Sequence, residues 1–148
     1  MKTIGQILTG NPVVTLPTGA TALEAARSMA ENRVGAILVQ DPGEGPVGMF
    51  TERDLMVRVV VPGLAPAEER IEDHMTRELY SVEPDLPLNK VAQEMQARHI
   101  RHLPVIRGQE VLGMLSFRDL LRAHLEVTTG EVEALTEYIH GPGEVLES

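Results

Sequence analysis

The chain has 148 residues, of which 43% are hydrophobic and 3% aromatic, and its formal net charge at neutral pH is −9. That charge argues against broad binding to DNA, RNA or an anionic membrane, because phosphate-backbone contacts require clustered positive side chains. The chain has no cysteine, which excludes disulfides, thiolate nucleophiles and cysteine-based zinc sites. No stretch has the length and hydrophobicity of a signal peptide or a membrane span, so we expect a cytoplasmic protein.

The first part of the chain predicts the order strand, helix, strand, strand, helix. Thr21 and Glu24 have the spacing of a capping box, which opens a helix because the hydroxyl and the carboxylate can satisfy free N–H groups reciprocally. Apolar residues then recur at helical spacing, and the later apolar runs have strand length and are separated by a segment rich in glycine and proline. The expected elements are strands at 13–16, 36–40 and 47–50, a helix from 21, and a helix at 52–60.

The same order of elements recurs in the second part of the chain. Residues 14–16 align with 80–82 at an offset of 66, and residues 53–55 align with 118–120 at an offset of 65. Because small, apolar and charged positions are retained together, the match indicates a tandem duplication. The second copy is expected to contain strands at 80–82, 103–106 and 111–115 and helices at 88–98 and from 117.

We therefore expect a mixed α/β fold of the α+β class, with two pseudo-symmetric β-α-β-β-α repeats packed together. A copy of roughly fifty residues buries too little surface to be stable alone, so the two copies should form one unit. The expected boundaries are 1–61 for the first repeat, 62–70 for a linker, 71–126 for the second repeat, and 127–148 for a C-terminal helix and tail. That last helix would place Val132, Leu135 and Ile139 on one face and cover the repeats or a subunit interface.

The most informative motif is a tetrad that occurs twice, as Thr51-Glu52-Arg53-Asp54 and as Ser116-Phe117-Arg118-Asp119. A hydroxyl followed three residues later by a carboxylate is the pattern of a helix cap, and capping alone could explain each copy. The same geometry also suits a nucleotide, because a helix N-terminus binds phosphate and a carboxylate can accept hydrogen bonds from ribose hydroxyls. The arginine in each tetrad adds positive charge that capping does not require.

These motifs resemble those of CBS domains, and the chain resembles the small stand-alone bacterial proteins that consist of one tandem CBS pair. The resemblance rests on residues 48–54, 113–119, 101–105 and 74–76 and covers about residues 3 to 126. It implies a non-catalytic regulatory module that binds an adenosine-type ligand, such as AMP, ADP, ATP, S-adenosylmethionine or NADH, between the repeats. It also implies a homodimer and a regulated partner protein, which the sequence does not identify.

The resemblance further implies which residues contact such a ligand. Asp54 and Asp119 would bind ribose, and the hydroxyls of Thr51 and Ser116 would bind phosphate. Each pocket would also use the first strand of the other repeat. The remaining implied contacts are Arg53, Arg118, Arg101 and His102 toward phosphate, with Thr15 beside the Asp119 site and Ser81 beside the Asp54 site.

The two copies differ at these positions, so we expect chemically unequal pockets. Residues 101–104, Arg-His-Leu-Pro, correspond to residues 35–38, Gly-Ala-Ile-Leu, which contain no basic group. Phe117 replaces the polar Glu52 and could either cover a base or block the pocket. The alternative to a ligand sensor is a ligand-free interaction module, in which the tetrads are caps only.

Two further classes of site are not expected. His99 and His102 are three residues apart, but no carboxylate completes a metal site with them. No nucleophile and base stand out as a pair, so we do not expect an enzyme.

Overall fold

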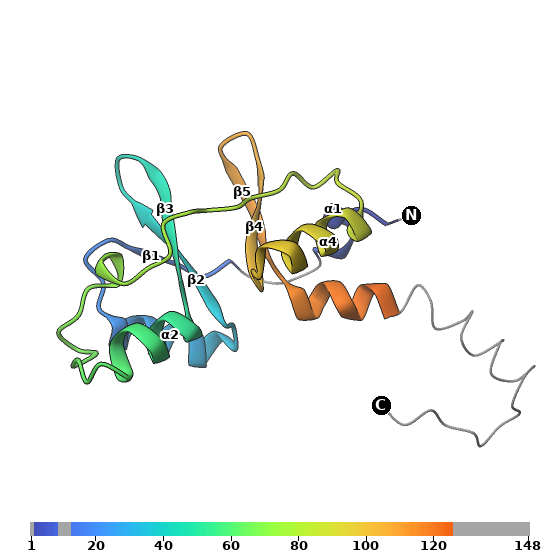
Figure 1. Ribbon diagram of the computed structural model, residues 1–148. Helices are drawn as coiled ribbons and strands as arrows, with labels where there is room; N and C mark the ends of the chain where they lie inside the picture. The colour runs from blue at the N-terminus through green and yellow to red at the C-terminus, as the bar shows by residue number, and fades with distance from the viewer. Residues whose placement is uncertain (1, 9–12, 126–148) are drawn as a thin grey trace, which may run out of the picture.

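The computed structural model describes residues 2–8 and 13–125, arranged as two halves that each contain a small sheet and its helices (Figure 1). The first sheet has the order β1-β2-β3. Strand β1 (Thr15–Pro17) runs parallel to β2 (Ala36–Asp41), and β2 is antiparallel to β3 (Gly45–Thr51). The strands expected at 36–40 and 47–50 are therefore present, each slightly longer than predicted.

The helices of the first half begin at capped residues. Helix α2 (Ala22–Asn32) follows Thr21, whose hydroxyl oxygen accepts a hydrogen bond from the Glu24 N–H at 3.1 Å. The helix predicted at 52–60 consists of a short α-helical turn, α3 (Glu52–Asp54), followed by a π-helix, η1 (Leu55–Val60). The wider π winding continues past η1, where a backbone N–H donates to a carbonyl five residues earlier.

The second half repeats the order helix, strand, strand, helix, but its sheet has two strands and its last helix has no π-helical part in the described residues. Helix α4 (Leu88–Arg98) precedes β4 (His102–Arg107) and β5 (Glu110–Ser116), which pair antiparallel, and residues 117–125 are helical. The strand predicted at 80–82 was wrong in extent, because only Val82 forms a parallel bridge, to Val105. The predicted helix around Val132, Leu135 and Ile139 lies outside the described residues.

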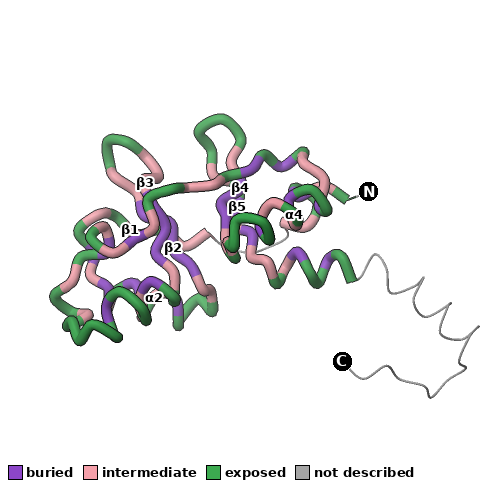
Figure 2. Tube along the Cα trace, in the orientation of Figure 1, coloured by how far each residue is buried: buried purple, intermediate pink, exposed green. Residues whose placement is uncertain are grey.

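Each half has its own hydrophobic core. In the first, Ile37, Val39 and Phe50 pack against buried residues of α2, including Met29. In the second, equivalent strand residues such as Leu103 pack against residues of α4. Because side chains alternate along a strand, the intervening residues lie on the opposite face of each sheet. Figure 2 shows the buried stretches along the strands and the inner sides of the helices.

The segment at the start of each repeat packs on the other repeat. Helix α1 (Ile4–Ile7) places the fully buried Ile4 in the core of the second half, where its N–H donates to the Leu86 carbonyl at 3.0 Å. The 3₁₀ turn η2 (Ile71–Asp73) and Met75 instead belong to the core of the first half. This exchange interlocks the two repeats, so that each core contains a segment from the start of the other repeat.

Candidate functional site

A cavity of about 530 Å³ lies between the two repeats. The first repeat contributes residues 33–36, from the end of α2 to the start of β2, and Glu52. The second contributes the start of β4, the end of β5 and the first turns of the helix at 117–125. The predicted site residues that line this cavity are Arg101, His102, Ser116, Arg118 and Asp119.

The second tetrad forms a cap at the edge of the cavity. The Asp119 N–H donates to Ser116 Oγ at 3.0 Å, and the Phe117 N–H donates to the Arg101 carbonyl at 2.7 Å. These bonds position the start of the helix beside β4. Phe117 lines the cavity and also packs against the second core, so its ring forms part of the wall.

His102 lies among the charged residues of the cavity. Burial lowers the pKa of its imidazole; Glu52 and Asp119 act in the opposite direction, and Arg101 and Arg118 lower it further. Gly35 provides the space beside this ring. A Cβ atom at position 35 would lie 3.1 Å from His102 Nε2 and 2.9 Å from Glu52 Oε1. The two repeats therefore approach each other closely at Gly35.

Two cavity arginines were not predicted as site residues. Arg122 lies one helical turn after Arg118, so its presence on the same face could have been found from i, i+4 spacing. Arg33 is the residue that ends α2, in the left-handed conformation with φ of 55°. No motif marks Arg33, because it lies near the second repeat only through tertiary packing.

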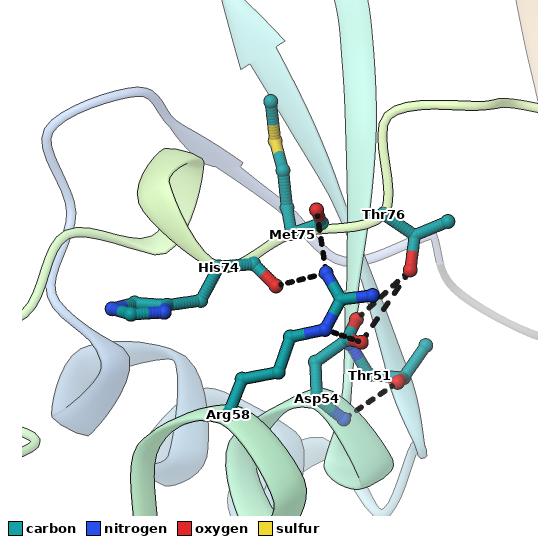
Figure 3. A network of polar contacts seen from close by, with 6 residues as sticks. All are labelled: Thr51, Asp54, Arg58, His74, Met75 and Thr76. Atoms are coloured by element: carbon teal, nitrogen blue, oxygen red, sulfur yellow. Dashed lines mark hydrogen bonds and ion pairs between the residues drawn. The ribbon is translucent and has the colours of Figure 1, made fainter. Parts of the chain in front are cut away.

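The first tetrad has a different environment, shown in Figure 3. Asp54 is buried, and its carboxylate accepts a hydrogen bond from the Thr51 N–H at 3.0 Å. The Asp54 N–H donates in return to Thr51 Oγ1 at 3.1 Å, which completes a capping box. The hydroxyl of Thr76 donates to the same carboxylate, at 3.3 and 3.4 Å from its two oxygens.

Arg58 extends this network to the start of the second repeat. Its Nε lies 3.7 Å from Asp54 Oδ1, and its Nη1 donates to the carbonyls of His74 and Met75 at 3.0 and 3.2 Å. The Asp54 carboxylate is thus used to hold residues 74–76 against the first repeat.

The remaining predicted site residues lie away from the cavity lining. Thr15, in β1, and Ser81, just before Val82, are exposed, as is Arg53 in α3. The lining found within the described residues includes none of these three side chains. The structure therefore brings together the second tetrad and residues 101–102, but not the predicted first-strand contacts.

Residues 2–8 and 13–125 contain no group of three or more His, Asp or Glu side chains that could hold a metal ion. In the same ranges, no helix is long and apolar enough to cross a membrane.

Comparison with known families identifies this arrangement. The family model described as the CBS domain matches residues 4–61 and 71–126. The chain belongs to the CBS domain family. The match covers both repeats of the CBS pair, and it confirms the resemblance inferred from the tetrads.

Individual relatives agree with this assignment. A CBS domain-containing protein of Arabidopsis thaliana, designated mitochondrial, is 35% identical over 128 residues, which are 84% of this chain; the chain spans 62% of that relative's length. A putative signal-transduction protein with CBS domains from Burkholderia ambifaria has 31% identity and a TM-score of 0.79, over 84% of this chain and 95% of its own. A CBS domain protein from Pyrobaculum aerophilum, complexed with AMP, has 32% identity and a TM-score of 0.74, over 86% and 98%. The mixed α+β fold of a CBS pair is confirmed.

Proposed function

We propose that this CBS pair is a non-catalytic regulatory module that binds an adenine nucleotide in the cavity between its repeats. The observation that supports this proposal is that Ser116, Asp119 and Arg101 line one cavity together with residues of the other repeat. The AMP complex of the Pyrobaculum relative supports an adenosine-type ligand. AMP, ADP and ATP are the favoured ligands, with S-adenosylmethionine and NADH as candidates to compare.

Each group in the cavity has a role in this proposal. The Asp119 carboxylate accepts hydrogen bonds from the ribose hydroxyls, for which a carboxylate has sufficient acceptor capacity. The phosphate is bound by the Ser116 hydroxyl and by Arg101 and Arg118. Phe117 offers an apolar surface to the base. Around Asp54 the contacts are structural, so we propose the ligand site at Asp119.

Regulation follows from the position of the cavity. A ligand that contacts both repeats stabilises the relative position of the repeats in which both sets of contacts form at once. It can shift the protein between two states only by binding one of them more tightly. A regulated partner, which the chemistry of the site does not identify, would distinguish those states. The expected cytoplasmic location stays a prediction, since one relative is designated mitochondrial.

We also infer that two copies associate through the second helix of each repeat. Met56 and Val60 on η1 are 55% exposed, and Leu121 and Leu125 on the helix at 117–125 are 46% and 61% exposed. Met56 is equivalent to Leu121, and Val60 to Leu125, by the offset of 65. A pseudo-symmetric molecule with the same apolar pair on both halves presents a self-complementary surface, which suits a twofold homodimer.

Thermal unfolding with AMP, ADP, ATP, S-adenosylmethionine and NADH tests the proposed function. At a ligand concentration of about 1 mM, a site with Kd of about 10 μM adds about 2.7 kcal/mol of stability. For a chain of this size, the midpoint should rise by about 5–10 °C. Asp119→Asn should remove the rise, and Asp73→Asn, which removes the same charge at an exposed position, should retain it. If none of the five ligands raises the unfolding midpoint, the proposal is wrong and a ligand-free interaction module is favoured.

A further inference from the structure

We propose that the cavity selects adenine nucleotides with two or three phosphates over AMP, and that Arg33 and Arg122 provide this selectivity. The inference rests on the proposed function, because it assumes that an adenine nucleotide occupies this cavity. It concerns two arginines outside the repeated tetrads.

The charge of the cavity supports this selectivity. Four of the 13 basic residues of the chain line it, namely Arg33, Arg101, Arg118 and Arg122. The carboxylates in the lining are Glu52 and Asp119. The cavity is thus positive within a chain whose net charge is −9. Such a site attracts anions and disfavours a cationic sulfonium ligand such as S-adenosylmethionine.

The four guanidinium groups of the cavity also lack ion pairs within the part of the chain that the structure describes. Within residues 2–8 and 13–125, Arg58, Arg98 and Arg107 lie within ion-pair distance of carboxylates. In the same ranges, none of the four cavity arginines has an ion pair. Arg118 and Arg122 also lie one helical turn apart, a spacing at which like charges repel. An anionic ligand between these groups would supply ion pairs for the four guanidinium groups.

The site also extends beyond the first cavity. A second cavity, of about 460 Å³, adjoins the first and shares Arg33, Glu52 and Arg118 with it. Beyond these residues, its lining is apolar, with Ala26 and Met29 among its members. A phosphate chain that starts at Ser116 and extends toward the second cavity would therefore reach residues that line both cavities, among them Arg33.

A single phosphate does not require all four arginines. Ser116 and the adjacent Arg101 and Arg118 already provide donors for one phosphate group. Each additional phosphate adds negative charge and oxygens that arginine can bind in a bidentate manner. Arg33 and Arg122 come from different elements, so together they can contact a chain of phosphates from two sides.

Calorimetric titration with AMP, ADP and ATP, without divalent cations and at constant ionic strength, tests this inference. We expect the wild-type protein to bind ATP about tenfold or more tightly than AMP. Arg33→Gln and Arg122→Gln should each reduce that ratio to about threefold or less while leaving AMP binding nearly unchanged. Both positions are exposed, so the core is not altered. Arg27→Gln is the matched control, because it removes the same charge from an exposed position of α2 outside the lining.

The outcomes separate this inference from the proposed function. Equal affinity for AMP and ATP, or an equal loss for both in the variants, would overturn the selectivity and leave nucleotide binding intact. If the ratio of ATP affinity to AMP affinity falls equally in Arg27→Gln, the effect comes from net charge, and the proposed selectivity is also overturned. If no adenine nucleotide binds the wild-type protein, the proposed function itself is wrong.

Discussion

Thr51 and Asp54 bind each other in both directions: the Thr51 N–H donates to the Asp54 carboxylate at 3.0 Å, and the Asp54 N–H donates to Thr51 Oγ1 at 3.1 Å. In the other repeat, Ser116 and Asp119 occupy the equivalent positions and line the cavity between the repeats. The same tetrad is thus used in two ways. One copy anchors residues 74–76, at the start of the second repeat, to the first repeat, and the other faces the proposed ligand.

Removal of the Asp54 side chain should destabilise the protein. Asp54→Ala removes the acceptor of the Thr51 N–H and leaves the Thr76 hydroxyl and Arg58 without this carboxylate. We expect a loss of about 1–3 kcal/mol in the free energy of unfolding, measured by urea titration. Nucleotide binding by the folded fraction should persist. Asp73→Ala, at an exposed position, should change stability by less than about 0.5 kcal/mol. An equal effect of both variants would contradict a structural role for Asp54.

Gly35→Ala should disturb both stability and ligand binding. The new methyl group would lie 3.1 Å from His102 Nε2 and 2.9 Å from Glu52 Oε1, so both side chains would have to move. We expect a destabilisation of about 1–3 kcal/mol and weaker nucleotide binding. Gly43→Ala is the control, since its methyl group would make only an ordinary contact, 3.6 Å from Asp41 Oδ1. The prediction fails if the two variants unfold at the same urea concentration and bind nucleotide equally.

The stability of the protein should depend on pH through His102. Burial, with Arg101 and Arg118, lowers the pKa of this imidazole against the opposing effect of Glu52 and Asp119. The unfolded chain takes up the proton as the pH falls below about 6.5, while the folded protein takes it up only at lower pH. The unfolded state therefore binds more protons in this window, and the free energy of unfolding decreases as the pH is lowered.

Urea unfolding at pH 7.5 and 5.5 measures this effect. The wild-type protein should lose more stability between these two pH values than His102→Gln, which has no group that titrates at this position. Identical pH dependence in the two proteins would show that His102 does not contribute.

The proposed homodimer depends on the exposed apolar residues of η1 and the helix at 117–125. Val60→Glu should place a charge in the contact and raise the dimer dissociation constant by about 30-fold or more. Leu112→Glu, on β5 and 39% exposed, should have little effect because it lies outside these helices. Sedimentation velocity over a range of concentrations measures both. A wild-type protein that stays monomeric at about 100 μM, or a dimer unaffected by Val60→Glu, would refute this interface.

The sequence alone determined the duplication, the family and most of the secondary structure. These features depend on residues close together in the chain: the helix starts at Thr21 and Thr51 follow from side chains that reach N–H groups three residues away. The cavity residues Ser116 and Asp119 were found for the same reason, since they belong to a local motif. The short bridge at Val82 was overestimated as a strand, because its extent depends on a partner strand more than twenty residues away.

Only the tertiary structure decided which tetrad faces a cavity and which residues complete it. Asp54 accepts from Thr76, and Arg33 lies near residues of the second repeat. Ile4 packs in the core of the second repeat, while Ile71 packs in that of the first. These contacts join residues that are distant in the chain, and periodicity and capping patterns carry no information on which distant surfaces meet. Their partners are selected by the packing of the whole chain, in which each buried apolar side chain must be covered and each buried charge must be paired.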